Sequence, residues 1–208
     1  MRRILLTDLD GTLVRFDTFK FWLLKVIARK PFGFLSYFLK NQEDDFRGRV
    51  KMASMQTFED LSDKSKIRLS KKYAEEISRK LPTDFWYFVD CFKPTHILLL
   101  SASPAIYVEQ LGLALGVDAL GTEIIQGRLH MMKGENKRKS AKKYLSQFSN
   151  EDYVYATGNT VDDISFMSLA NSGNFIHFAK RRKNFTIRGY SNLNWTQLRE
   201  LFCNPSKK

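Results

Sequence analysis

The sequence predicts a doubly wound α/β fold, in which helices cover both faces of a parallel sheet. The first observation behind this prediction is a set of short apolar runs, each of which leads directly into a polar cluster. The clearest runs span residues 4–7, 97–100, 153–156 and 175–178. Continuous apolar runs of this length are typical of strands buried on both faces, and helical patterns lie between them.

The second observation is what stands at the end of these runs. Asp8 follows the first run, Ser101 the second and Gly158-Asn159 the third. In open α/β sheets, ligands bind beyond the carboxyl ends of the strands, where loops from separate strands converge. The polar clusters therefore indicate an enzyme whose site lies at this edge of the sheet.

The third observation is a stretch with helical patterns alone, from about residue 14 to residue 91. One predicted helix begins at a cap formed by Asp17 or Thr18 and is broken at Pro31. Its apolar face consists of Phe19, Trp22, Leu23, Val26 and Ile27. A second helical stretch covers residues 58–81. We therefore expect a core of residues 1–15 and 91–208, with residues 16–90 inserted after the first strand as a helical cap.

The composition limits the class of protein without fixing its partner. The chain has 208 residues, 43% of them hydrophobic, which suffices for one core and a modest insertion. Its formal net charge of +12 favours anionic substrates, nucleic acid or an anionic membrane surface. The densest basic clusters, residues 137–143 and 180–183, are interpreted as solvated surface, apart from Lys137.

The cysteines and the apolar segments bear on location. Cys91 and Cys203 stand far apart with no ligand pattern around them, so both are interpreted as ordinary thiols in a reducing compartment. Acidic chemistry begins at Asp8, too early for a signal peptide. Charges and Pro31 interrupt the apolar stretch 19–39, so no transmembrane helix is expected. We expect a cytoplasmic protein, with the inner face of the membrane as an additional location.

The sequence Asp8-Leu9-Asp10-Gly11-Thr12 places two carboxylates two positions apart at a strand end. One carboxylate can form an aspartyl-phosphate, while the other protonates the leaving oxygen and then activates water. Gly11 lets the backbone approach a phosphate closely. An EF-hand calcium loop is excluded, because Leu13 and Phe19 occupy the positions that require glycine and glutamate. A simple turn is the remaining alternative.

Polar residues at the other strand ends complete this chemistry. Ser101 and the backbone of Ala102 precede an expected helix and suit an anion, although the serine could equally be a helix cap. Lys137 can neutralise phosphate charge, and residues 158–163 offer the oxygen ligands that Mg²⁺ prefers. A serine hydrolase is disfavoured, because the sequence has no Gly-x-Ser-x-Gly motif and no histidine in a triad context.

Taken in order, these motifs resemble those of the haloacid dehalogenase-like superfamily, over nearly the whole chain. The chain is similar to the branch with a small helical cap, which includes phosphoserine phosphatases and phosphatidylglycerophosphate phosphatases. Residues 8–12 resemble the first motif, Ser101 the second, Lys137 the third and residues 158–163 the fourth. The resemblance implies a Rossmann-like core and a magnesium-dependent phosphate monoester hydrolase.

The resemblance also implies roles for the matching residues. Asp8 would be the nucleophile, Asp10 the acid/base and Lys137 a partner of the phosphoryl oxygens. The implied substrate-binding residues are Ser101, Gly11, Thr12 and Ala102, and the implied Mg²⁺ ligands are Asp8, Asp10, Asn159 and Asp163. Dehalogenases lack the carboxylate of Asp10, so phosphate-ester hydrolysis is favoured over carbon–halogen cleavage.

One position departs from the family pattern. The fourth motif usually begins with Gly-Asp, whereas this chain has Gly158-Asn159. A neutral amide oxygen can bind Mg²⁺, but the site loses a negative charge and weaker metal affinity is expected. A catalytically weak anion-binding or nucleic-acid-binding protein is therefore an alternative. The sequence contains no recognition helix, zinc finger or RNP-type strand, so specific nucleic-acid binding is not expected.

The segment after the first motif bears on the substrate. Phosphoserine phosphatases usually carry a glutamate there, whereas this chain has Asp17-Thr18-Phe19, which resembles the lipid-phosphatase branch. Residues 19–40 combine aromatic residues and lysines, which suit peripheral contact with an anionic membrane or the packing of a cap helix on the core. A lipid or lipid-linked phosphate monoester is the expected substrate, and a soluble metabolite such as phosphoserine is the alternative.

Overall fold

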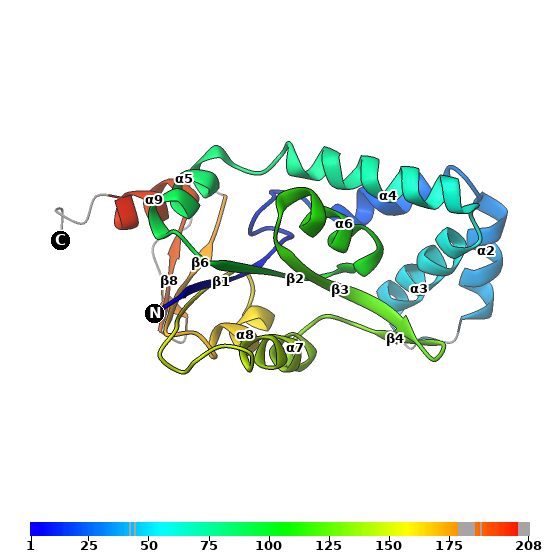
Figure 1. Cartoon of the computed structure of the whole chain (residues 1–208). Coiled ribbons are helices and arrows are strands. Elements are labelled where there is room, and N and C mark those ends of the chain that lie inside the picture. Colours follow the sequence, from blue (N-terminus) through cyan, green and yellow to red (C-terminus); the bar gives the residue numbers. More distant parts are fainter. Residues whose placement is uncertain (42, 44, 179–185, 188, 204–208) are drawn as a thin grey trace.

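The computed structural model describes residues 1–41, 43, 45–178, 186–187 and 189–203. The basic cluster at residues 180–183 therefore lies outside the described residues. Within them, the strands form one sheet in the order β4-β3-β2-β1-β5-β6-β8-β7 (Figure 1). Their bounds are β1 Arg3–Asp8, β2 His96–Pro104, β3 Asp118–Ile125, β4 Arg128–His130, β5 Tyr153–Gly158, β6 Ser172–Ile176, β7 Thr186–Ile187 and β8 Tyr190–Leu193.

The sheet confirms the predicted doubly wound α/β fold. The first three apolar runs lie within β1, β2 and β5, and the fourth overlaps β6 at Phe175 and Ile176; these strands pair in parallel. Two short antiparallel pairs, β3 with β4 and β7 with β8, extend the two edges. Strand β1 lies in the middle, between β2 and β5, so the first motif follows the most central strand.

Helices pack on both faces of this sheet. Leu5 faces a cluster that includes Tyr107 and Trp195, whereas Ile4 and Leu6 face a second cluster on the opposite side. The alternation follows from the two-residue period of a strand. The covering helices are α6 Ala105–Leu115 and α9 Trp195–Cys203 on one face, and α7 Glu135–Leu145 and α8 Ile164–Met167 on the other (Figure 1).

Helices alone occupy the chain between β1 and β2, as the sequence predicts. They are α1 Thr18–Ile27, α2 Pro31–Lys40, α3 Phe46–Glu59, α4 Asp63–Ser78 and α5 Thr83–Phe92. The side chain of Asp17 caps α1 by accepting from the backbone N–H of Lys20. Pro31 both separates α1 from α2 and opens α2, where its missing N–H costs nothing. The helical stretch expected over residues 58–81 is divided, because α3 ends at Glu59 and α4 begins at Asp63.

The five inserted helices pack in two places. Helix α3 packs against α1 and α2, and α4 lies along α6, whereas α5 packs against α9. None of the helices in the described part of the chain has the length and apolar character needed to cross a membrane. The division into a core and a cap at residues 16–90 stays a prediction. The contact of α5 with α9 leads us to propose that the cap consists of α1 to α4.

The interpretation of the cysteines as thiols is wrong. Cys91 on α5 and Cys203 at the end of α9 form a disulfide across 112 positions of sequence, with their Cα atoms 5.4 Å apart. They meet because α5 and α9 pack side by side, a contact that includes the Arg199–Asp84 ion pair at 2.7 Å. Only tertiary packing creates this proximity. The cysteines therefore give no support for a reducing compartment.

Candidate active site

A cavity of about 210 Å³ lies at the carboxyl ends of the central strands. Six of the predicted site residues line it, namely Asp8, Asp10, Ala102, Lys137, Asn159 and Asp163. The other three adjoin these residues. Thr12 bonds to Asp8, Ser101 bonds to Asp10, and Gly11 lies against Asn159. The structure thus brings together every site residue that the sequence predicts.

Asp8 ends β1 and is almost completely buried. Its Oδ1 accepts a hydrogen bond from Lys137 Nζ at 2.6 Å, and its Oδ2 accepts one from Thr12 Oγ1 at 3.0 Å. Burial raises the pKa of Asp8 to about 7; Lys137 opposes this effect, and the charges of Asp163 and Asp10 add to it. The site therefore holds more negative charge than Lys137 alone balances.

Lys137 connects Asp8 to a third carboxylate, that of Asp163. Lys137 lies in the first turn of α7, and its Nζ also donates to Asp163 Oδ1 at 2.7 Å. Burial lowers the pKa of Lys137, but Asp8 and Asp163 outweigh it and hold the pKa above its usual value. Burial likewise raises the pKa of Asp163, but the attraction of Lys137 and backbone hydrogen bonds keep that pKa below its usual value. The lysine is therefore a fixed cation between two acids.

The turn after β5 holds Asp163 in place. Asp163 Oδ2 accepts from the backbone N–H groups of Asn159 and Thr160, at 3.1 and 3.0 Å, and from the Thr160 hydroxyl at 2.9 Å. This capping box closes the short helical turn Val161–Asp163. One carboxylate oxygen thus organises the turn, while the other faces Lys137.

Asp10 is held by contacts from three directions. Its Oδ1 accepts from the backbone N–H of Thr18 at 2.6 Å. Its Oδ2 accepts from Ser103 Oγ at 2.8 Å and from Ser101 Oγ at 3.2 Å. Ser103 was missed by sequence reasoning, although it stands only two positions after Ser101 in the same strand. These contacts fix the direction of the second carboxylate.

Gly11 joins the first motif to the fourth. Its φ is +79°, which favours glycine, and a Cβ built there would lie 1.9 Å from Asn159 Nδ2. A side chain at position 11 would therefore displace Asn159. The glycine is required for this close approach of the loops after β1 and β5.

The cap contributes residues to the cavity that the sequence analysis did not identify. Arg47 and Lys51, both on α3, line it together with Asp45. Lys51 is 2% exposed, and its Nζ donates to the carbonyl oxygen of Ala102 at 2.5 Å. A signal was available, because Lys51 shares an apolar helical face with Met55 and Phe58. A lysine on a buried face is unusual and indicates a partner in the interior.

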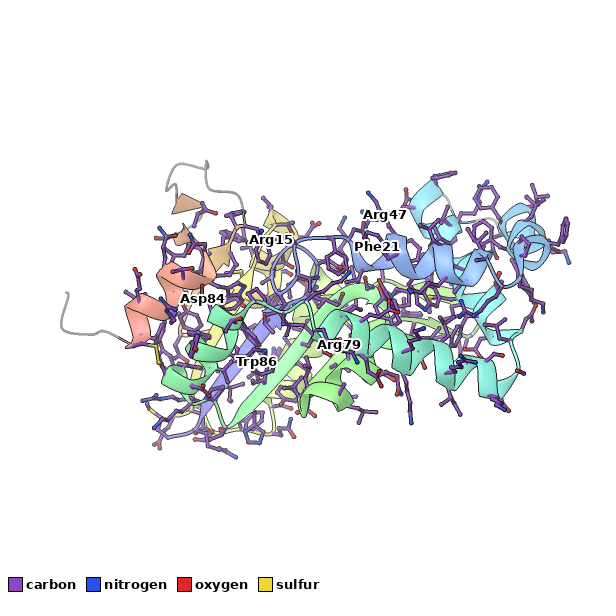
Figure 2. All side chains as sticks on the ribbon, turned by 90° about the horizontal axis from the view of Figure 1, so that it is seen from above. Arg15, Phe21, Arg47, Arg79, Asp84 and Trp86 are labelled. Atoms are coloured by element: carbon purple, nitrogen blue, oxygen red, sulfur yellow. A yellow bond between two sulfur atoms is a disulfide. The ribbon has the colours of Figure 1, made fainter. Side chains whose placement is uncertain are left out.

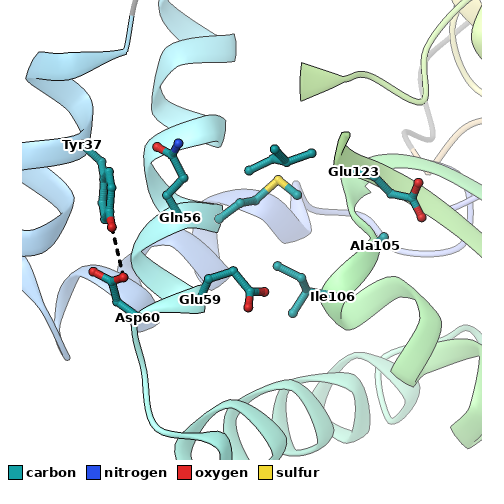
Figure 3. A pocket seen from close by; sticks show the side chains of 9 residues that line it. Tyr37, Gln56, Glu59, Asp60, Ala105, Ile106 and Glu123 are labelled. Carbon is teal, nitrogen blue, oxygen red and sulfur yellow. Dashed lines mark hydrogen bonds between the residues drawn. The ribbon is translucent and has the colours of Figure 1, made fainter. Parts of the chain in front are cut away.

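A larger cavity, of about 540 Å³, lies between α2, α3 and α6 (Figure 3). It contains none of the predicted site residues. Its charged side chains are the carboxylates of Glu59, Asp60 and Glu123, and Asp60 accepts a hydrogen bond from Tyr37. Among the described residues, no lysine or arginine lines this cavity to offset the repulsion between its carboxylates and a phosphate, whereas four basic side chains line the smaller one, namely Arg47, Lys51, Lys133 and Lys137. The smaller cavity at Asp8 is therefore the better candidate for phosphate chemistry.

The donor atoms at Asp8 suit Mg²⁺. This ion prefers a few hard oxygen ligands and keeps several waters. Asp8 and Asp163 already share one cation, Lys137, and Asn159 is packed against the first motif. Among the described residues no group of three or more His, Cys, Asp or Glu side chains could hold a metal ion. A magnesium site here would therefore be built on the carboxylates of Asp8 and Asp163, with the Asn159 amide oxygen as a neutral ligand.

The fold and the site define a class of protein: an α/β hydrolytic enzyme with paired aspartates after its central strand and a helical insertion beside them. The family model described as haloacid dehalogenase-like hydrolase matches residues 5–168. The chain belongs to this family. A comparison with curated proteins gave no match.

Solved structures share the fold at low sequence identity. A protein of unknown function from Bordetella pertussis Tohama I is 14% identical, with a TM-score of 0.62, over 85% of this chain and 90% of that one. A HAD-family hydrolase from Salmonella enterica serovar Typhi is 15% identical, with a TM-score of 0.60, over 97% and 72%. A phosphoserine phosphatase from T. onnurineus is 15% identical, with a TM-score of 0.54, over 98% and 96%.

Proposed function

We propose that this protein is a magnesium-dependent phosphatase that hydrolyses a phosphate monoester through an aspartyl-phosphate on Asp8. The observation that carries the proposal is the arrangement of Asp8 and Asp10, two separately held carboxylates at one cavity, with Lys137 bonded to the first. A solved phosphoserine phosphatase, 16% identical with a TM-score of 0.50, is described as a phospho-aspartyl intermediate analogue. The shared fold supports the proposal of the same intermediate here.

The residues divide the reaction into two displacements. Asp8 attacks phosphorus and its oxygen becomes bonded to the phosphoryl group, while the bond to the leaving oxygen breaks and Asp10 gives that oxygen a proton. Asp10 then takes a proton from water, which attacks phosphorus and releases Asp8 and inorganic phosphate. Lys137 and Ser101 stabilise the charge on the phosphoryl oxygens. Mg²⁺, held by the oxygens named above, would supply further positive charge for the same purpose.

The outer surface of the cap supports a lipid or lipid-linked substrate. No residue of α2 is buried, although the helix is mostly apolar. The most exposed large apolar side chains around it are Leu24 (64%), Phe32 (86%), Leu39 (73%) and Phe46 (70%). Exposed basic residues also occur on α1, α2 and the turn between them, namely Lys20, Arg29 and Lys40. An apolar surface with basic residues around it suits an anionic membrane.

The alternatives are a soluble small-metabolite phosphatase, such as a phosphoserine phosphatase, and a catalytically weak anion- or nucleic-acid-binding protein. The first requires the same site and differs only in the substrate. The second would follow if Asn159 disables the metal site. Specific nucleic-acid binding is not part of the proposal.

The test is phosphate release from soluble monoesters and from lipid phosphates in vesicles, with and without Mg²⁺. Asp8→Asn serves as the matched variant, because it keeps the shape of the side chain and removes the attacking charge. We expect Mg²⁺-dependent release by the parent and a loss of at least about a thousandfold in Asp8→Asn. An Asp8→Asn variant as active as the parent would contradict the mechanism. No release from any ester would favour the binding protein.

A further inference from the structure

Lys51 is a buried cation that forms no direct ion pair within the described part of the chain, although Asp10 and Asp17 attract its charge from a greater distance. It is 2% exposed, and its Nζ donates to the Ala102 carbonyl at 2.5 Å and lies 5.2 Å from the centroid of the Phe19 ring. A carbonyl and an aromatic face attract an ammonium group, but neither neutralises its charge. A buried charge without a counter-ion is costly and is rare in proteins.

Each of the other basic side chains that line this cavity forms a direct ion pair with a carboxylate. Lys137 contacts Asp8 and Asp163, at 2.6 and 2.7 Å. At the rim, Lys133 pairs with Asp162 at 3.2 Å and Arg47 pairs with Asp17 at 3.0 Å. Burial lowers the pKa of Lys51 to about 8, so Lys51 is charged in most molecules at neutral pH. Its ammonium group therefore has a carbonyl oxygen as its direct hydrogen-bond partner, where the other cations of the cavity contact a carboxylate.

The position of Lys51 indicates which part of a substrate would supply this anion. Its partner, Ala102, stands between Ser101 and Ser103, and both serines donate to Asp10 Oδ2. In the proposed function, Asp10 protonates the leaving oxygen, whereas Lys137 contacts the nucleophile Asp8. Lys51 thus lies on the side of the leaving group, and it reaches this place from the cap helix α3.

We propose that Lys51 binds a second anionic group, carried by the leaving group of the substrate. The inference rests on the proposed function and narrows its substrate class to phosphate monoesters that carry another negative charge beside the ester. Esters of neutral alcohols are poor substrates on this account. A carboxylate and a phosphodiester both meet the requirement, because the ammonium recognises a charged oxygen.

Binding of phosphonates tests this inference without turnover. Phosphonoacetate and ethylphosphonate are of similar size and cannot be hydrolysed, and only the first carries a carboxylate; 3-phosphonopropionate and propylphosphonate form a longer pair. We expect calorimetric titration of the parent, in Mg²⁺, to give about tenfold tighter binding of the carboxylated member in at least one pair. Lys51→Met, which keeps the apolar stem, should remove this preference and leave the binding of the member without a carboxylate within about twofold.

The controls separate the possible causes. Lys64→Met makes the same change at an exposed lysine of α4 that does not line the cavity, and it should keep the parent's preference. Thermal melting checks that Lys51→Met is folded, and the parent's own preference is measured independently of any variant. Equal binding within both pairs, or a preference that survives in Lys51→Met, would overturn the inference. Failure of the proposed function would instead appear as absent phosphate release, whatever the phosphonates show.

Discussion

At the scale of single residues, Asp8 is placed where its surroundings oppose its charge. Its folded pKa of about 7 exceeds its unfolded value of 3.8, chiefly because of burial. Between about pH 4 and about pH 7, the folded protein therefore binds more protons at Asp8 than the unfolded protein does. By linkage, this carboxyl makes the metal-free fold less stable as the pH rises through that window.

Asp8→Asn removes this dependence and should stabilise the metal-free protein at neutral pH. Near pH 8, we expect the free energy of unfolding of the variant to exceed that of the parent by roughly 1 to 4 kcal/mol. Below about pH 4, the two free energies should be equal. Urea denaturation in EDTA across this pH range measures the effect. Parallel curves for the two proteins would contradict it. An inactive variant that is more stable than its parent would also exclude unfolding as the cause of lost activity.

Asn159 offers a second test at the residue scale. Asn159→Asp adds a carboxylate of nearly the same shape beside Asp8 and Asp163. The added charge should strengthen Mg²⁺ binding by about tenfold and lower the stability of the metal-free protein, because like charges repel. Thermal melting in EDTA and over a Mg²⁺ titration measures both effects. A variant with unchanged Mg²⁺ affinity would show that position 159 does not contact the metal.

Sequence analysis identified site residues where local order carries the information. Asp8, Asp10 and Asp163 stand within short motifs at strand ends, and the structure brings their side chains to one cavity. Lys51 was missed because it reaches Ala102 only through the packing of α3 on the core, a contact between residues 51 positions apart. Ser103 was missed because its role depends on the position of Asp10, which lies 93 residues away in the sequence and is set by the pairing of β1 with β2.

At the scale of elements, α5 and α9 form a unit fixed by covalent and ionic contacts. The Cys91–Cys203 disulfide joins their ends, and Arg199 and Thr196 of α9 both contact Asp84. Figure 2 shows Asp84 and Trp86 on α5, next to α9 and away from Arg47. Phe88 packs against Trp195 and Phe202 between the two helices. The disulfide is therefore embedded in an interface that already exists.

Reduction of this disulfide should destabilise the protein while leaving it folded. A bond that closes so long a loop contributes roughly 2 to 5 kcal/mol, chiefly by restricting the unfolded chain. Urea denaturation with and without a phosphine reductant measures the difference. Cys91→Ser is the control, because its urea midpoint should equal that of the reduced parent and should not change when the reductant is added. Identical midpoints for oxidised and reduced parent would contradict the expectation.

The limits of sequence analysis at this scale are physical as well. The central strands were predictable because they are buried on both faces and thus apolar throughout. Strand β4 is short and mostly exposed, so no apolar run marks it. The break between α3 and α4 contains no glycine or proline, and it is marked only by Asp60, Ser62 and Asp63, which are poor residues in a helix interior and common at caps.

At the scale of the whole molecule, α2 lies at the opposite end from α9 (Figure 1), and its side chains Phe32 and Leu39 are exposed. If this end contacts an anionic membrane, Phe32→Glu combined with Leu39→Glu should weaken binding to phosphatidylglycerol vesicles by at least about tenfold, because both apolar burial and charge attraction are lost. Vesicle sedimentation measures binding. Leu113→Glu, at a residue of α6 that is 75% exposed, is the matched control. Equal binding by all three proteins would exclude α2 as the contact.

Thr18 both begins the first inserted helix and holds the second carboxylate of the site. It begins α1, donates its N–H to Asp10, and contacts Ser103 and Tyr107 through its hydroxyl. If Asp10 is the acid, as proposed, we expect substitutions to differ in effect along the insertion. Side chains on α3 could then be exchanged to fit other leaving groups without moving Asp10. The first turn of α1 has no such freedom, since a change in its path would redirect the Asp10 carboxylate that Thr18 holds.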